Sequence, residues 1–110
     1  MKIKEEDAFR VLSVCEQYEG QVDLAQNLGY SVGKVNYILK ALIAKGHVKM
    51  QNFASSEKKL NYRYLLTPEG MHQKLTLTES FIVRKKAEYD QLQQQLEETR
   101  QRLAQKDYSI

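Results

Sequence analysis

Four polar side chains of types that can recognise nucleic-acid bases occur within seven residues of one another: Lys34, Asn36, Tyr37 and Lys40. Asparagine can pair with the edge of adenine, lysine with guanine or with phosphate, and the tyrosine hydroxyl with phosphate. Gly33, beside them, would allow a close approach of its backbone to another surface. This set of residues predicts contact with the major groove of double-stranded DNA, provided that one helix presents the four side chains outward.

A helix over residues 31–45 would position these side chains. Its opposite face carries apolar residues at positions i, i+3, i+4 and i+7, which must be buried: Val35, Ile38, Leu39 and Leu42. A shorter apolar pattern precedes it, and Gly29 can adopt the positive φ at which that earlier helix would end. Ser31 then serves as the N-cap of the second helix. We therefore predict a helix-turn-helix over residues 24–46. An exposed amphipathic helix with a solvated polar face is the alternative.

An earlier helix is expected to form the floor of the core. Three consecutive acidic residues, Glu5 to Asp7, stand where it would begin, and carboxylates there are favoured by the helix dipole. Apolar residues continue from Ala8 to Tyr18, and Gly20 is expected to end the element. Cys15 lies on the apolar face, where a core position is expected.

The apolar pattern changes to a period of two after Gly46. Residues 47–53 and 60–66 alternate in this way and are joined by the polar segment 54–59, which predicts a β-hairpin. A hairpin directly after a helix-turn-helix forms a winged helix. Its cationic residues Lys58, Lys59 and Arg63 are expected to reach the DNA backbone or the minor groove. The alternative is a hairpin that only closes the core.

Thr67 and Pro68 mark the start of a long helix, as an N-cap and a first helical residue. A helix over residues 68–107 would be about 60 Å long. Apolar residues recur along it every seven positions, with one between them: Leu75, Ile82, Tyr89, Leu96 and Leu103, and Leu92. We expect this ladder to form a coiled coil with a second copy, giving a homodimer. A solvated helix, or pairing with a different protein, is the alternative.

The predicted fold is therefore mainly α with a small β-hairpin. A winged helix-turn-helix domain spans residues 1–66, and a long C-terminal dimerisation helix spans residues 67–110. At 110 residues the chain has room for one modest domain and an appendage. Positive charge is concentrated in residues 32–63, which hold seven Lys and Arg against one acid, whereas residues 1–31 hold three against six. Such an asymmetry favours a nucleic-acid partner.

Other classes of function find little support in the residues. No glycine-rich phosphate loop, metal cluster or nucleophile with its base can be assembled, so we expect neither an enzyme nor a cofactor or metal. Cys15 is the only cysteine, which excludes an intrachain disulfide. The sequence has no apolar run of 18 residues and no leader segment. We therefore expect a cytoplasmic protein, associated with the nucleoid when bound to DNA, and no membrane partner.

The series LAQNLGYSVGKVNYILKALIAKGHVK, followed by YRYLLTPEG and a long charged helix, resembles the MarR-type winged-helix transcriptional regulators. It looks closest to the short branch associated with bacterial extracellular-polysaccharide gene clusters, and the resemblance covers residues 5–102. It implies that the helix matching residues 31–45 reads the major groove and that the hairpin matching residues 47–66 is the wing. The implied DNA contacts are Ser31, Lys34, Asn36, Tyr37, Lys40, Lys58, Lys59 and Arg63.

Typical members of that family are longer, and extra terminal helices build their dimer interface and ligand pocket. Here one C-terminal helix is present, so a small-molecule effector is not expected. The sequence thus predicts a homodimeric, sequence-specific DNA-binding transcription regulator with a pseudo-palindromic operator. The alternative is a winged-helix module that binds another protein and assembles through its coiled coil.

Overall fold

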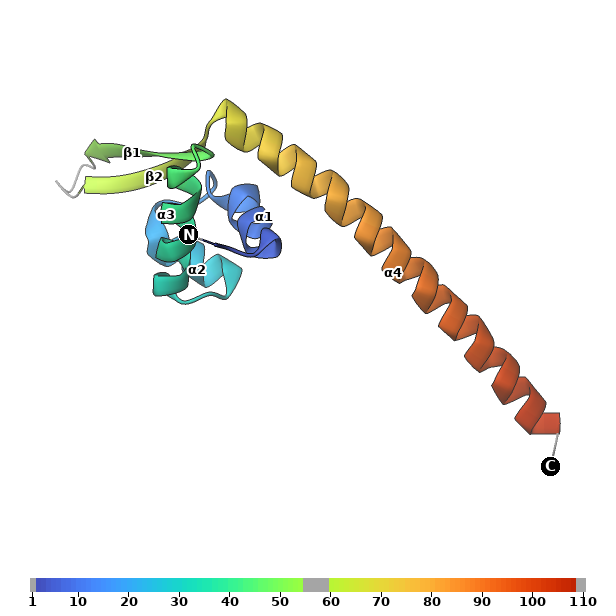
Figure 1. The fold of residues 1–110 in the computed structure, drawn as a ribbon. Coiled ribbons are helices and arrows are strands. Elements are labelled where there is room, and N and C mark those ends of the chain that lie inside the picture. Colours follow the sequence, from blue (N-terminus) through green and yellow to red (C-terminus); the bar gives the residue numbers. More distant parts are fainter. Residues whose placement is uncertain (1, 55–59, 109–110) are drawn as a thin grey trace. The chain divides into compact units, whose positions relative to one another are not determined.

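The structure is a computed structural model that describes residues 2–54 and 60–108. Its elements follow one another in the order shown in Figure 1: α1 (Glu5–Val14), α2 (Gly20–Leu28), α3 (Val32–Ala44), β1 (Val48–Ala54), β2 (Leu60–Leu66) and α4 (Pro68–Tyr108). Contacts divide the chain into two compact units, Met1–Thr78 and Glu79–Ile110. The first unit, here called the winged domain, includes the first turns of α4. The predicted fold class, mainly helical with one hairpin and a long C-terminal helix, is confirmed.

Helix α1 begins at Glu5, with acidic residues in its first turn as expected, but it ends earlier than predicted. The predicted end near Tyr18 is wrong, because the helix stops at Val14. The backbone N–H of Gln17 donates to the carbonyl of Val14, a tighter turn than an α-helix makes. The apolar pattern continues past the helix because Cys15, in the turn, is still fully buried. Burial raises the pKa of its thiol to about 11, as suits a core residue rather than a reactive one.

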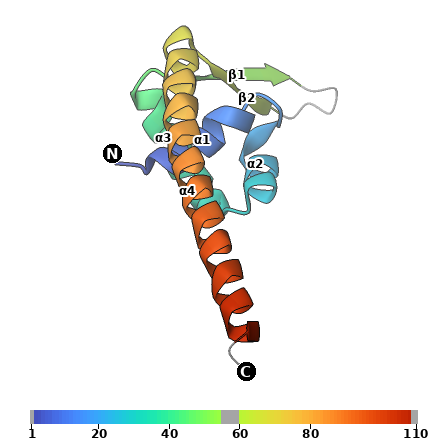
Figure 2. The ribbon, with the colours of Figure 1, turned by 90° about the vertical axis from the view of Figure 1, so that its right-hand side faces the viewer.

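Helices α2 and α3 form the predicted helix-turn-helix. Gly29 ends α2 at a φ of 71°, a left-handed conformation that favours glycine. The Ser31 hydroxyl accepts a hydrogen bond of 3.1 Å from the backbone N–H of Lys34, so Ser31 is the N-cap of α3. The predicted stripe on α3 is buried, and its exposed fractions do not exceed 1%: Val35, Ile38, Leu39 and Leu42. Figure 2 shows the three short helices gathered at the base of the hairpin.

The hairpin is antiparallel, and its register runs from Val48 opposite Leu66 to Ala54 opposite Leu60. Strand β1 starts one residue later than predicted, and β2 has the predicted bounds. Glu19 makes an additional antiparallel bridge to Arg63, which gives β2 a short second neighbour besides β1. Val48, Tyr64 and Leu66 are buried in the core of the winged domain. The predicted cationic turn, with Lys58 and Lys59, lies outside the described residues.

A compact junction joins the end of α3, the start of β1 and the first turn of α4. The backbone N–H of Thr67 donates to the carbonyl of His47 (3.1 Å), and its hydroxyl donates to the carbonyl of Gly46 (2.5 Å). The same hydroxyl accepts from the N–H of Gly70 (2.9 Å), which confirms Thr67 as the N-cap of α4. Gly70 is buried, and a Cβ added there would lie 2.8 Å from the carbonyl carbon of His47 and closer still to its oxygen. Only glycine fits this contact without a shift of the backbone.

Candidate nucleic-acid interface

The face of α3 opposite its buried stripe is exposed. Ser31, Gly33 and Lys40 are exposed, and Tyr37 keeps 47% of its surface accessible. Among the described residues, the side chain of Lys40 has no hydrogen-bond or ion-pair partner. Its amine is therefore free to meet a phosphate or a base. The Tyr37 hydroxyl donates to the backbone carbonyl of Lys2 (3.3 Å). This face therefore combines a cation, hydroxyl groups and a position without a side chain, as the sequence predicts.

Asn36 is held more tightly than the sequence suggests. Its side chain is partly buried, and its Oδ1 accepts a hydrogen bond of 3.0 Å from Nε2 of Gln21, on α2. The same Gln21 nitrogen donates to the hydroxyl of Tyr64, on β2 (3.2 Å). A two-point contact with adenine uses both the oxygen and the nitrogen of an asparagine side chain. Asn36 would therefore have to give up its bond to Gln21 in order to make one.

Lys34 belongs to a cluster at the start of α3 that the sequence analysis missed. Its Nζ lies 3.5 Å from Oδ1 of Asp7 and 4.1 Å from the centre of the Tyr30 ring. The Tyr30 hydroxyl donates to the same Asp7 oxygen (2.7 Å), and the Arg10 guanidinium lies 4.6 Å from the centre of the ring. Burial, and then the hydrogen bond to Asp7, raise the pKa of Tyr30 above its usual value. Half-exposed ion pairs of this kind contribute only about 0–1 kcal/mol, so a phosphate could compete for Lys34.

Two exposed cations lie on the described part of the hairpin. Arg63 is one of the predicted DNA contacts, and Lys49 is an additional cation. Arg63 is exposed on β2, where its guanidinium lies 3.4 Å from a carboxylate oxygen of Glu19. Lys49, on β1, is also exposed and was not singled out by the sequence analysis. Its place on the wing strand is the signal that could have identified it. The predicted contacts Lys58 and Lys59 lie outside the described residues, so they stay predictions.

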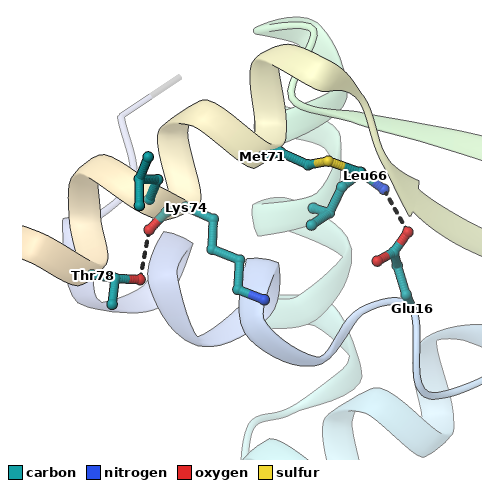
Figure 3. Close-up of a pocket in the computed structure, with 6 residues that line it drawn as sticks. Glu16, Leu66, Met71, Lys74 and Thr78 are labelled. Carbon is teal, nitrogen blue, oxygen red and sulfur yellow. Dashed lines mark hydrogen bonds between the residues drawn. The ribbon is translucent and has the colours of Figure 1, made fainter.

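An apolar groove opens on another part of the winged domain (Figure 3). It has a volume of about 380 Å³ and is lined by Glu16, Leu66, Met71, Lys74, Leu75 and Thr78. A Glu16 carboxylate oxygen accepts from the backbone N–H of Leu66 (3.3 Å), so this acid is tied to the end of β2. Met71 and Leu75 are each more than half exposed.

The apolar ladder of α4 is exposed along its length. All six of its members keep more than half of their surface accessible: Leu75, Ile82, Tyr89, Leu92, Leu96 and Leu103. Over the described residues, no helix is both long enough and apolar enough to span a membrane. In the same part of the chain, no three or more His, Cys, Asp or Glu side chains are grouped so that they could hold a metal ion.

The sequence matches no protein-family model and no curated protein. Solved structures do resemble the fold. A PadR-like transcriptional regulator from Bacillus cereus aligns with a TM-score of 0.70 and 19% identity, over 78% of this chain and 90% of the other. A MarR/EmrR family transcriptional regulator from Acinetobacter aligns with a TM-score of 0.57 and 25% identity, over 90% and 75% of the two chains. The adhesin competence repressor of Streptococcus pyogenes aligns with a TM-score of 0.60 and 19% identity, over 86% and 67%.

The first two are transcriptional regulators of the PadR-like and MarR/EmrR types, the third is a repressor, and none of the three is named as an enzyme. The chain therefore has the winged-helix fold of such regulators. The narrower resemblance to regulators of extracellular-polysaccharide gene clusters stays a prediction from the sequence.

Proposed function

We propose that this protein is a transcription regulator that binds double-stranded DNA in a sequence-specific manner. The observation that carries the proposal is the two-sided character of α3. One side is fully buried in the core, and the other presents Ser31, Tyr37 and Lys40 to solvent. A helix in this position of a helix-turn-helix is the one that enters the major groove. The regulators with the same fold support this interpretation.

The side chains of the interface would divide the work. Lys40 is free to bind DNA as it stands, whereas Lys34 and Asn36 must exchange Asp7 and Gln21 for DNA. Lys34 and Asn36 would therefore contact bases only where the DNA offers bonds that replace those to Asp7 and Gln21. We propose that Lys58, Lys59 and Arg63, on the wing, mainly contact phosphates. Their contribution would then fall steeply with salt and depend little on sequence.

We further propose that the protein acts as a homodimer formed through α4. The exposed ladder supports this, because an apolar stripe of that length on a soluble helix needs a covering partner. A two-fold dimer would recognise a pseudo-palindrome with half-sites about one helical turn of DNA, or a multiple of it, apart. The protein would act in the cytoplasm, on the nucleoid. In keeping with its sequence resemblance, its targets would include an extracellular-polysaccharide gene cluster.

The proposal is tested by fluorescence anisotropy with duplexes tiled across the region upstream of the protein's own gene, and with a scrambled control. Titrations are made at two salt concentrations. We expect one tile to bind more tightly than the control, with an affinity that weakens steeply as salt rises. Equal, weak binding to every tile would contradict sequence specificity.

A module that binds another protein is the second candidate function. The exposed ladder on α4 is the observation that favours it, since that face could pair with a different protein. No binding to any duplex at low salt, together with loss of a protein partner when the ladder is disrupted, would support this candidate over DNA binding.

A further inference from the structure

We propose that residues 2–4 form a cationic arm that contacts DNA phosphates beside α3. The arm would be a third DNA-binding element, in addition to the recognition helix and the wing. This inference rests on the proposed DNA-binding function. It assigns a role to Lys2 and Lys4, which neither the spacing of the helix-turn-helix nor the resemblance identifies.

The arm is tied to α3 by contacts near both of its ends. At one end, the carbonyl of Lys2 accepts the hydrogen bond from the Tyr37 hydroxyl. At the other, Lys4 is the N-cap of α1, and Asp7, in the first turn, contacts Lys34. Tyr37 and Lys34 lie one turn apart on α3. The segment therefore runs beside the exposed face that the proposal places in the major groove.

The backbone of the arm presents its two lysines to solvent. Lys4 has extended backbone, with φ at −70° and ψ at 143°. In extended backbone, alternate residues face the same side. Ile3 is partly buried, while Lys2 and Lys4 are both exposed. The isoleucine thus anchors the segment against the domain, and the two amines are left for an external partner.

The local charges favour a phosphate as that partner. Lys2 and Lys4 add two positive charges to those of Lys34 and Lys40, on the same side of the winged domain. Of the nearby acids, Asp7 is already occupied by Tyr30 and Lys34. Glu5 and Glu6 are exposed in the first turn of α1, and their negative charges partly offset the positive charge of the arm. We therefore expect the arm to contribute affinity for any duplex rather than sequence preference.

In this arrangement Tyr37 acts as a positioning residue. Its hydroxyl holds the backbone of Lys2, whereas the sequence pattern predicts a direct contact of that hydroxyl with phosphate. Loss of the hydroxyl alone should therefore act through the arm. This separates its role from that of a direct DNA contact.

The test compares the double variant Lys2→Ala, Lys4→Ala with the wild-type chain. Anisotropy titrations use the preferred duplex and a scrambled duplex over a series of salt concentrations. Each lost phosphate contact lowers the slope of log affinity against log salt by about 0.9. We expect a slope reduced by about 2 and a loss of affinity of about tenfold or more, similar for both duplexes. Arg84→Ala with Lys86→Ala removes two charges from exposed sites on α4 and is the matched control.

A second variant, Tyr37→Phe, keeps the ring and removes the hydroxyl. We expect a loss of affinity of about two- to fivefold in the wild-type background and no further loss when Lys2 and Lys4 are already alanine, because coupled residues are not additive.

Unchanged affinity and slope in the double lysine variant, with intact wild-type binding, would overturn the inference. Increased affinity would also overturn the inference, because it would show that residues 2–4 cover α3 and hinder DNA binding. Failure of the wild-type chain to bind any duplex would instead overturn the proposed function itself.

Discussion

The winged domain and the later part of α4 place their apolar side chains in opposite ways. In the winged domain, Val11 on α1, Leu39 on α3 and Tyr64 on β2 are all buried. On α4 beyond Thr78, Ile82 and Leu96 are exposed although they recur with the regularity of core residues. The first region buries its own apolar surface, whereas we propose that a second chain covers the apolar side chains of the other. Stability and assembly should therefore respond to different substitutions.

The largest expected effect is on assembly. Replacing Ile82 and Leu96 together by Asp would place charges within the apolar contact of a coiled coil, which is strongly unfavourable. We expect complete conversion of dimers to monomers, measured by light scattering, with unchanged thermal unfolding of the winged domain. Val83→Asp is the control, because Val83 is exposed on α4 but lies off the ladder. An unchanged mass for the double variant would show that α4 does not form the dimer through this face.

A core substitution should give the reverse result. Leu39 is 1% exposed, and Leu39→Ala would leave a cavity that costs about 2–5 kcal/mol of unfolding free energy. Urea unfolding followed by circular dichroism measures this loss. Leu103→Ala, the same change on the exposed ladder, should leave unfolding of the winged domain unaltered and weaken only the dimer. Equal destabilisation by both variants would remove the distinction between the two regions.

Two of the helical glycines, Gly33 and Gly70, provide a further contrast in stability. Gly70→Ala would force its Cβ against the backbone of His47, and overpacking of this kind costs about 1–3 kcal/mol. Gly33 has no atoms within 4 Å of an added Cβ, so Gly33→Ala should stabilise α3 by about 0.5–1 kcal/mol. Denaturant midpoints of the two variants give both values. Stabilisation by Gly70→Ala would contradict the close contact at the junction.

Cys15 should add a pH dependence to the stability of the winged domain. Because burial raises the pKa of this thiol from 9.0 to about 11, the unfolded chain ionises first as the pH rises. The folded state then holds more protons than the unfolded state. The stability contribution is thus present below pH 9 and is lost between about pH 9 and 11. Wild-type protein should lose on the order of 1–2 kcal/mol more over this range than Cys15→Ala. Parallel pH profiles for the two proteins would count against a buried, neutral thiol.

Local sequence patterns predicted the helices and the hairpin because each depends on neighbouring residues. The helix-ending Gly29 and the N-caps Ser31 and Thr67 were found in the same way, since their hydrogen bonds span only a few residues. The end of α1 was missed because Cys15 stays buried in a turn that keeps the apolar pattern.

The interface was harder to predict than the elements. A helical pattern indicates which side of α3 faces outward, and Lys40 and Tyr37 do lie there. It cannot show that Asn36 meets Gln21, or that Lys34 meets Asp7, because those partners come from other helices. Their contacts depend on how the helices pack. The assignment of each residue to DNA stays a prediction for the binding experiments to test.

The junction of Gly46, Thr67 and Gly70 determines where the chain can be cut. Thr67 bonds to the backbone at Gly46 and His47, and its hydroxyl caps the first turn of α4. A truncation just after β2 would leave these carbonyls without their partners and would uncover the surface against which Gly70 packs. A truncation after Thr78 would retain the whole junction. The smallest portable form of the winged domain therefore ends inside the long helix, and a different C-terminal segment could be grafted on beyond that point.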